Sequence, residues 1–195
     1  MRIIGITGGV GTGKSKVLSY MENQFNAVIC QADHVAWELQ KPGQECYNQI
    51  IIEFGKEILN EDETINRGIL ANIVFSDEIA LEKLNRIMHP AVKTHILQWI
   101  EIEQAKGTNF FVIEAALLLE TNYDEICDEI WYIYSDEKTR RTRLKENRNY
   151  TDEKIDSIMK NQLSDLTFQN RCDIIIDNNG EFNETCCQID KVMNN

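Results

Sequence analysis

The residues best suited to chemistry lie near the start of the chain, in the stretch GGVGTGKS that follows MRIIGIT. The pattern Gly-x-x-x-x-Gly-Lys-Ser is that of a phosphate-binding loop, or P-loop. Glycines without a Cβ let backbone N–H groups crowd around an anion, and the helix that follows adds the positive end of its dipole. The residues predicted to bind nucleotide phosphates are Gly8, Gly9, Val10, Gly11, Thr12, Gly13, Lys14, Ser15 and Lys16.

Two carboxylates at predicted strand ends are candidates to act beside this loop. Asp33 follows a short strand that we expect to neighbour the first strand, so its carboxylate should face the P-loop. There it would accept a proton from a hydroxyl nucleophile or hold a metal-bound water, but an N-cap on the next helix fits equally well. Glu114 closes the stretch FFVIE and resembles a Walker B carboxylate that orders Mg²⁺, while a solvated or capping glutamate also fits.

A basic segment stands out in an otherwise acidic chain. On a helix, Arg141, Lys145 and Arg148 share one face. Charged helices are usually solvated, yet phosphoryl transfer needs cationic charge beyond Lys14 and Mg²⁺, which favours a lid over the nucleotide. Six of the twenty Lys and Arg residues belong to the segment: Lys138, Arg140, Arg141, Arg143, Lys145 and Arg148.

Weaker signals accompany these motifs. The sequence DNNG at 177–180 indicates a turn, which would also place backbone groups near a nucleotide base. His89, before Pro90, is interpreted as a structural helix-end histidine rather than a substrate contact. Core or helix packing is expected for the three tryptophans, Trp37, Trp99 and Trp131.

The elements that position these residues follow from hydrophobic periodicity. Strands are predicted at Arg2–Thr7, 27–30, Phe110–Glu114, Glu129–Tyr134 and 172–177. A helix over Lys14–Phe25 after the glycine loop makes a βαβ unit, which implies a parallel sheet with a right-handed crossover. Between 34 and 106 the pattern is helical, with expected breaks at Pro42-Gly43 and His89-Pro90. The predicted class is α/β with a mostly parallel sheet.

Length and composition limit the classes of protein that fit. The 195 residues are 43% hydrophobic and 27% charged, which suits one sizeable core in a soluble, cytoplasmic protein. The apolar runs are too short to span a bilayer, and no signal peptide is recognised. A net charge of -12 disfavours nucleic acid and anionic membranes as partners. Six cysteines without C-x-x-C or zinc spacing indicate reduced thiols of no special role.

Taken in order, these motifs resemble the dephospho-CoA kinases over nearly the whole chain. The similar segments are ITGGVGTGKS, ADHVAWEL, RGILANIVFSDE, LEKLNRIMHP, VIEAALLLE, CDEIWYIY, RTRLKENR, an Asn161-Gln162 pair and CDIIIDNNG. The resemblance implies an enzyme that uses ATP and Mg²⁺ to phosphorylate the ribose 3'-hydroxyl of dephospho-CoA, the last step of coenzyme A synthesis. It also implies a three-layer P-loop kinase fold with a nucleotide-binding core (1–33 and 108–195), a helical acceptor-binding insertion (34–107) and a lid with flanking helices (136–170).

The resemblance also implies roles for single residues. Asp33 would be the base that accepts the ribose hydroxyl proton, and Lys14, Arg140 and Arg143 would act on the transferred phosphoryl group. Ser15 would ligate Mg²⁺, with Glu114 acting through water. Acceptor contacts are expected at Asp33, Arg67, His89, Leu117 and Glu120, and contacts near the nucleotide base at Asn178 and Gly180.

Three positions depart from the family pattern. Ala116 stands where proline is common, and Cys172 stands where alanine often precedes the aspartate of the last strand. A lid arginine is usual near Asn147, and here Arg148 is displaced by one residue, about 100° around a helix. Arg143 or Arg140 therefore becomes the better lid candidate.

Two rival functions have a place beside this hypothesis. Another small-molecule P-loop kinase, acting on nucleoside monophosphates, is disfavoured by the stretch from RGIL to HP. A nucleotide-binding sensor without turnover is disfavoured by the intact Lys14, Ser15 and Asp33. ATP and dephospho-CoA are the expected partners, and a monomer or small homo-oligomer is the expected state.

Overall fold

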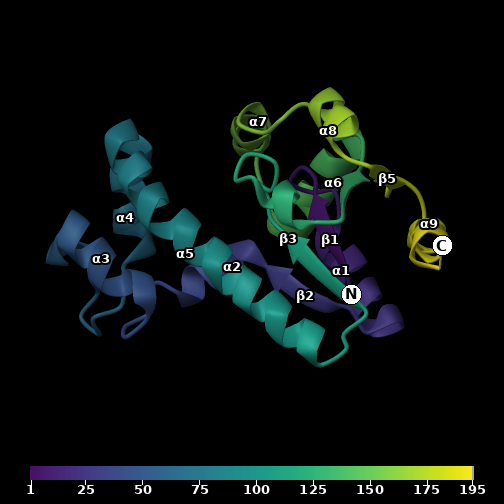
Figure 1. Ribbon diagram of the computed structural model, residues 1–195. Helices are drawn as coiled ribbons and strands as arrows, with labels where there is room; N and C mark the ends of the chain where they lie inside the picture. Colours follow the sequence, from purple (N-terminus) through teal and green to yellow (C-terminus); the bar gives the residue numbers. More distant parts are fainter. Residues whose placement is uncertain (195) are drawn as a thin grey trace. The chain divides into compact units, whose positions relative to one another are not determined.

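The computed structural model describes residues 1–194, which form two compact units (Figure 1). The first unit comprises Met1–Ile29 together with the chain from Lys106 onward, and the second is Cys30–Ala105. The boundaries predicted from the sequence are 34 and 108. The first unit carries the P-loop and the second consists mainly of helices.

The sheet has five strands in the order β2-β3-β1-β4-β5. Its members are β1 (Arg2–Thr7), β2 (Val28–Gln31), β3 (Phe110–Glu114), β4 (Glu129–Tyr134) and β5 (Ile174–Asp177). The central strand β1 pairs in parallel with β3 and β4, and β4 pairs in parallel with β5. The expectation that the second strand neighbours the first is wrong, because β3 lies between them. The crossover through α1 carries the chain past the position next to β1, and that position is filled later by β3.

The core of the first unit forms because β-branched and aromatic residues alternate between the two faces of the sheet. Ile4 and Ile6 of β1 are fully buried and belong to one cluster with Met21 and Ile189. These last two lie on α1 (Lys14–Phe25) and α9 (Phe182–Met193), which therefore cover one face. Tyr132 stacks on Phe168 of α8 (Asp165–Arg171), with ring centroids 4.8 Å apart.

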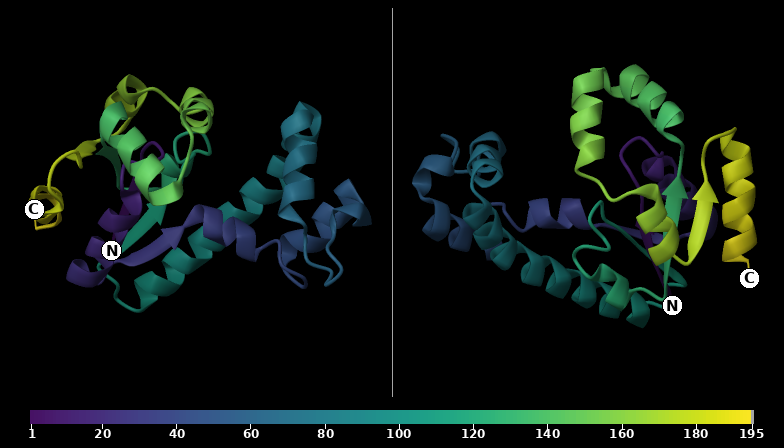
Figure 2. Two further views of the ribbon diagram at one scale, coloured as in Figure 1. Left: turned by 180° about the vertical axis from the view of Figure 1, so that it is seen from behind. Right: turned by 90° about the horizontal axis from the view of Figure 1, so that it is seen from above.

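Three consecutive helices carry the basic segment and its surroundings: α6 (Glu137–Arg148), α7 (Asp152–Lys160) and α8 (Figure 2). Each helix has an N-cap residue whose side chain accepts a hydrogen bond from a backbone N–H of the first turn: Asp136, Thr151 and Ser164. The N–H of Thr139 donates to Asp136 and lowers the pKa of that carboxyl group. The helices predicted over 136–170 are present.

The second unit packs three helices against a long fourth one. These are α2 (Ala32–Glu38), α3 (Glu45–Phe54) and α4 (Arg67–Ser76) against α5 (Glu78–Ala105), with a 3₁₀ turn at Lys56–Ile58. The break expected at His89-Pro90 is wrong, because α5 continues through Pro90. Proline removes one intrahelical N–H, but buried Val92, Ile96 and Ile100 anchor the helix beyond it. His89 is thus an exposed mid-helix residue and not a helix-end histidine.

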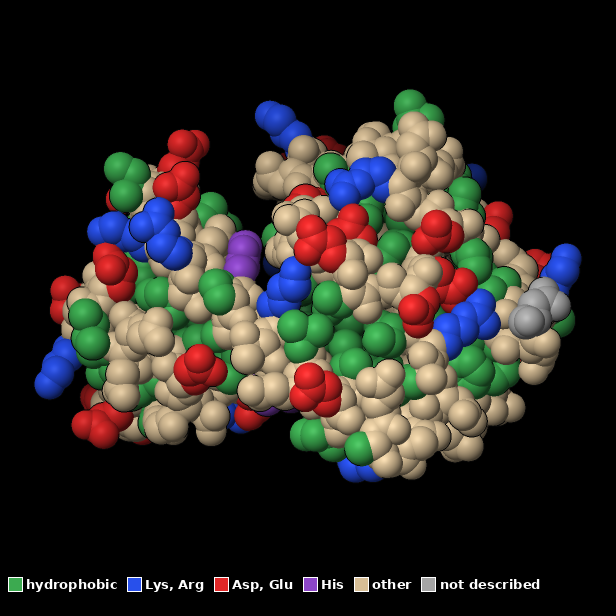
Figure 3. All heavy atoms as spheres, in the orientation of Figure 1, with side chains coloured by type: hydrophobic (Ala, Val, Ile, Leu, Met, Phe, Trp, Pro, Cys, Tyr) green, Lys and Arg blue, Asp and Glu red, His purple; other side chains and the backbone are tan. Residues whose placement is uncertain are grey.

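The surface agrees with the acidic composition. In Figure 3 acidic and basic side chains are interspersed over the visible face, and no continuous basic area is seen on that face. Within residues 1–194, every helix is too short or too polar to cross a bilayer.

We predict that two adjacent residues of β5 differ sharply in their contribution to stability. Ile176 is 1% exposed and Ile175, on the opposite face, is 46% exposed. Ile176→Ala should lower the free energy of unfolding by about 2–5 kcal/mol, because it leaves a cavity in the core. The matched Ile175→Ala should cost about 1 kcal/mol or less. Urea unfolding of both variants measures the difference, and equal losses would contradict this description of the core.

Candidate active site

The P-loop leaves the carboxyl end of the central strand and enters α1 at Lys14. Gly13 precedes the helix with φ +90°, in the left-handed region that favours glycine. A Cβ at Gly13 would collide with the side-chain amide of Asn178, and a Cβ at Gly8 would lie 2.6 Å from the carbonyl oxygen of Ile133. Glycine is therefore required here by both backbone conformation and close packing.

The carbonyl oxygen of Thr12 is the point at which three other segments hold the loop. It accepts a hydrogen bond from the Asn178 side-chain amide at 2.7 Å and lies 3.4 Å from the Arg143 guanidinium. The buried Ser135 hydroxyl lies 3.3 Å away. The other end of the Asn178 side chain accepts from the hydroxyl of Thr185, which is 1% exposed. Arg143 of α6, Ser135 just before α6 and Asn178 just after β5 thus meet at one atom of the loop, and α9 acts on it only indirectly, through Thr185 and Asn178.

A second set of hydrogen bonds, from Arg140 and Gln162 to Val10, holds the tip of the loop. Arg140 is 7% exposed, and its Nε donates to the carbonyl oxygen of Val10 at 2.9 Å. The side-chain oxygen of Gln162 accepts from Arg140 at 2.8 Å and from the N–H of Val10 at 3.2 Å. Asp165, which accepts from the hydroxyl of Tyr132, lies 3.8 Å from the same guanidinium. Burial, and then that hydrogen bond to Asp165, raise the pKa of Tyr132.

The loop lysine has a carboxylate beside it. Lys14 donates to the carbonyl oxygen of Gly8 at 2.8 Å, and its Nζ lies 3.8 Å from a carboxylate oxygen of Glu114. Glu114 is 9% exposed and stands opposite Ile6 in the sheet register, at the carboxyl edge from which the loop departs. The alternative of a solvated glutamate is wrong, because Glu114 is buried next to Lys14.

The basic helix α6 divides into two faces. Arg140 and Arg143 turn toward the P-loop, as described above. Arg141 pairs with Glu137 on its own helix and with Asp156 of α7, and Lys145 pairs with Asp152 of α7 at 2.8 Å. Arg148 is exposed at the last position of α6. The face expected from Arg141, Lys145 and Arg148 is therefore a surface ion-pair face, and the cations at the loop are the other two arginines.

Similarity to known proteins agrees with this geometry. A family model described as dephospho-CoA kinase matches residues 2–184. The chain is 35% identical to the dephospho-CoA kinase of Oceanobacillus iheyensis over 98% of this chain and 96% of that protein. It is 33% identical to that of Shouchella clausii over 95% and 94%. The chain belongs to the dephospho-CoA kinase family.

Solved structures show the same fold. A protein of Thermus thermophilus superposes with a TM-score of 0.86 at 20% identity, covering 99% of this chain and 96% of that one. The dephospho-CoA kinase of Campylobacter jejuni gives 0.73 at 22% identity, over 100% and 96%. A shikimate kinase from Acinetobacter baumannii gives 0.52 at 12% identity, over 99% and 91%. Members of the dephospho-CoA kinase family are ATP-using kinases that transfer phosphate to an alcohol group.

The acceptor residues predicted for a dephospho-CoA kinase lie in both units. Asp33 is exposed in the first turn of α2, where Gln31 is the residue that precedes the helix. The N-cap interpretation of Asp33 is therefore wrong. Arg67 is the first residue of α4, and His89 is exposed on α5.

Leu117 and Glu120 lie in the turn that follows β3. The carbonyl oxygen of Leu117 accepts from the N–H groups of Glu120 and Thr121, while the Leu117 side chain is 53% exposed. Ala116, one of the departures from the family pattern, is exposed in the same turn. Cys172, a second departure, ends α8, and burial raises the pKa of its thiol to about 12.

Of the residues predicted to contact the nucleotide, Asn178 is buried, whereas Gly180 and Lys16 are exposed. Asn178 is buried with its side chain on Thr12 and Thr185, so it shapes the loop, and its contact with the base stays a prediction. Gly180 is exposed after β5. Lys16 is exposed and lies 4.1 Å from the centroid of the Phe182 ring, on α9.

Sequence reasoning missed three residues that shape the loop. Ser135, Gln162 and Thr185 all contact the P-loop or the side chains on it, from positions more than 120 residues away along the chain. Gln162 stood in the Asn-Gln pair of the family resemblance, which was the only signal for any of them. Nothing in the local sequence distinguishes Ser135 or Thr185 from an ordinary surface hydroxyl.

We predict that Gln162→Leu weakens ATP binding by about 10-fold. The change removes the acceptor of both the Val10 N–H and the Arg140 guanidinium and leaves two donors without their partner. Titration calorimetry with ATP measures the dissociation constant. The matched control is Asn161→Leu, because the exposed Asn161 side chain donates to Ser157 on the helix that it caps, and this variant should bind ATP close to wild type. Unchanged affinity in Gln162→Leu would show that the hydrogen bonds to Gln162 do not hold the loop in its binding conformation.

Proposed function

We propose that this protein transfers the γ-phosphoryl group of ATP to the 3'-hydroxyl of the ribose in dephospho-CoA, giving coenzyme A and ADP. The observation that carries the proposal is the concentration of three cations on the P-loop of a chain with net charge -12: Lys14, Arg140 and Arg143. Such a set suits a transferred phosphoryl group, whose charge must be stabilised in the transition state. The family to which the chain belongs supplies the acceptor.

In this proposal the chain acts mainly by positioning and by charge. The backbone N–H groups of the loop and Lys14 bind the β- and γ-phosphates. Arg140 and Arg143 neutralise the group in transit. Asp33 accepts the proton of the 3'-hydroxyl as its oxygen attacks phosphorus in line with the departing ADP oxygen. The O–H bond of the 3'-hydroxyl and the bond from the γ-phosphorus to the ADP oxygen break, while a bond from the ribose oxygen to phosphorus and an O–H bond on the Asp33 carboxylate form.

The residues present fit Mg²⁺ as a partner of the nucleotide. Mg²⁺ is commonly held by one or two protein oxygen ligands together with substrate phosphates. Ser15 offers an exposed hydroxyl in the first turn of α1, and Glu114 offers a carboxylate beside Lys14. Within residues 1–194, no group of three or more His, Cys, Asp or Glu side chains forms a metal site of its own. Mg²⁺ bound by Ser15, with Glu114 acting through water, would supply further neutralisation of the phosphates.

The acceptor residues in this proposal are Asp33, Arg67, His89, Leu117 and Glu120, with Asn178 and Gly180 near the nucleotide base. We place the reaction in the cytoplasm and expect a monomer or a small homo-oligomer.

The activity is tested by mixing the protein with ATP, Mg²⁺ and dephospho-CoA, with AMP as a parallel acceptor. We expect coenzyme A as the product by mass, and no ADP formed from AMP above background. Phosphorylation of AMP instead would support a nucleoside monophosphate kinase. Tight ATP binding without any product would favour the nucleotide sensor.

The base is tested by Asp33→Asn. We predict that kcat falls by about 100-fold or more, because the variant cannot accept the hydroxyl proton, while the dissociation constant for ATP stays nearly unchanged. Glu45→Gln is the matched control, since Glu45 is also exposed in the first turn of a helix of the same unit. Normal turnover of Asp33→Asn would remove Asp33 from this role.

A further inference from the structure

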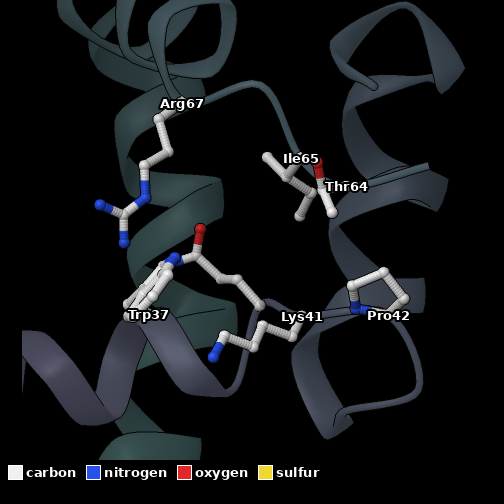
Figure 4. Close-up of a pocket in the computed structure, with 7 residues that line it drawn as sticks. Trp37, Lys41, Pro42, Thr64, Ile65 and Arg67 are labelled. Atoms are coloured by element: carbon white, nitrogen blue, oxygen red, sulfur yellow. The ribbon is translucent and has the colours of Figure 1, made fainter. Parts of the chain in front are cut away.

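The cavity of about 550 Å³ in the second unit belongs to the proposed acceptor site, because Arg67 lines it (Figure 4). Trp37 is 39% exposed at its wall, so the expectation that Trp37 serves as a core residue is wrong, whereas Trp131 is fully buried as expected. A different chemical feature lies in the first unit, in the turn between β5 and α9, where Asn179 precedes Gly180.

Asn179 is the one asparagine of the 195-residue chain that precedes a glycine. Asparagine is a thermolabile residue, because the backbone nitrogen of the next residue can attack its side-chain amide. The two groups are already neighbours, so the attack has the advantage of an intramolecular reaction. Glycine hinders it least, since it has no Cβ. Asn179 is therefore the asparagine of this chain with the least steric protection.

The chemistry needs only hydroxide and water. Hydroxide removes the proton of the Gly180 N–H, and the nitrogen forms a bond to Cγ of Asn179. The bond from Cγ to Nδ2 breaks, and the side-chain nitrogen takes a proton from water and leaves as ammonia. Water then opens the resulting succinimide at one of its two carbonyl groups. The product is aspartate, or isoaspartate in which the main chain runs through the former side chain.

The structure leaves the attacking nitrogen accessible. Gly180 is exposed, and the turn around it is neither helix nor strand. Within residues 1–194, the N–H of Gly180 donates to no protein acceptor. Hydroxide can therefore reach this N–H without breaking a hydrogen bond of the fold.

The structure also activates the amide that is attacked. The N–H of Asp136 donates to the Asn179 side-chain oxygen at 2.8 Å. A backbone donor at this position stabilises the negative charge that develops on the oxygen when Cγ is attacked, as in an oxyanion hole. The side-chain nitrogen of Asn179 donates to Asp177 at 2.8 Å, which holds the amide in this orientation.

The same contacts connect Asn179 to the nucleotide site. Asp136 is the N-cap of α6, the helix that carries Arg140 and Arg143 to the P-loop. An aspartate at 179 would lose the donor to Asp177 and place two carboxylates within hydrogen-bond distance, where like charges repel. An isoaspartate would lengthen the main chain by a methylene group directly after Asn178, whose side chain holds Thr12. Either product thus disturbs the support of the P-loop.

We propose that Asn179 is a modification site at which water converts the amide to aspartate or isoaspartate, and that this change weakens the binding of ATP. The protein would lose nucleotide affinity with age through one defined residue. The inference concerns ATP affinity and is independent of which acceptor the enzyme phosphorylates.

The modification is tested by ageing the full-length protein at mildly acidic and mildly alkaline pH. Peptide mass spectrometry should show the mass change from NH₂ to OH at Asn179, and faster at alkaline pH because hydroxide removes the Gly180 proton. The exposed Asn147 and Asn183 should stay unmodified. In titration calorimetry, the fraction of protein that binds ATP with the original affinity should fall in step with the modified fraction.

The effect on binding is tested without ageing by Asn179→Asp, which makes one of the two products directly. We expect its dissociation constant for ATP to be raised by about 10-fold in fresh protein, since one hydrogen bond is replaced by a repulsive contact. The matched control is Asn183→Asp, because Asn183 is exposed in the first turn of α9 and gains the same charge four residues away. This control should bind ATP like wild type.

Two results would overturn the inference. One is an Asn179 peptide that stays unmodified at alkaline pH, and the other is wild-type affinity for ATP in Asn179→Asp. A fresh protein that binds ATP and makes no coenzyme A would contradict the proposed function alone, because the modification is read from mass and from ATP binding.

Discussion

The P-loop depends on one carbonyl group, that of Thr12. A glycine-rich loop has no side chains with which to fix its own conformation, and glycine loses more freedom on ordering than any other residue. The loop is therefore held from outside by Asn178, Arg143 and Ser135, which gather at this oxygen. Amide, guanidinium and hydroxyl groups from three distant positions thus converge on one carbonyl oxygen of the loop, while the N–H of Val10 at the loop tip donates to Gln162.

The same arrangement solves an electrostatic problem. A chain with net charge -12 repels nucleotides at long range. Its cations can attract an anionic ligand effectively only at short distances and in fixed positions, because charge–charge interactions beyond about 10 Å are screened at ordinary ionic strength. Arg140 achieves this by burial against Val10 and Gln162, and Lys14 by its place next to Glu114. The ion pairs of Arg141 and Lys145 on the opposite face leave these cations directed at the loop.

Much of this could be predicted from sequence, and the failures have physical causes. The strands β1, β3 and β4 and the helix α1 were predicted with their observed bounds, because hydrophobic runs and the glycine loop are local signals. The strand order was predicted wrongly, because pairing is decided by contacts between distant segments. Pro90 was predicted to end a helix, yet burial of one face of α5 outweighs the loss of a single hydrogen bond. Ser135 and Thr185 could not be identified, because their importance arises only when the loop folds onto them. Which basic side chains of α6 face the loop could not be predicted, because Arg141 and Lys145 pair with acidic residues of α7, and these contacts are visible only in the structure.

The central position of β1 has a consequence for how the chain is made. Ile4 is hydrogen-bonded between strands that contain Val112 and Glu129, and Cys30–Ala105 intervenes. During synthesis the first strand has no partner on either side until the residues through Glu114 are released, and it keeps one unpaired side until the residues through Tyr134 follow. Its unpaired backbone N–H and C=O groups can pair with other strands throughout that interval, which lasts about six to twenty-five seconds at elongation rates of about 5–20 residues per second. The intervening helices contact mainly one another and can assemble first. The long separation therefore makes pairing of the central strand a later event in folding than assembly of the intervening helices.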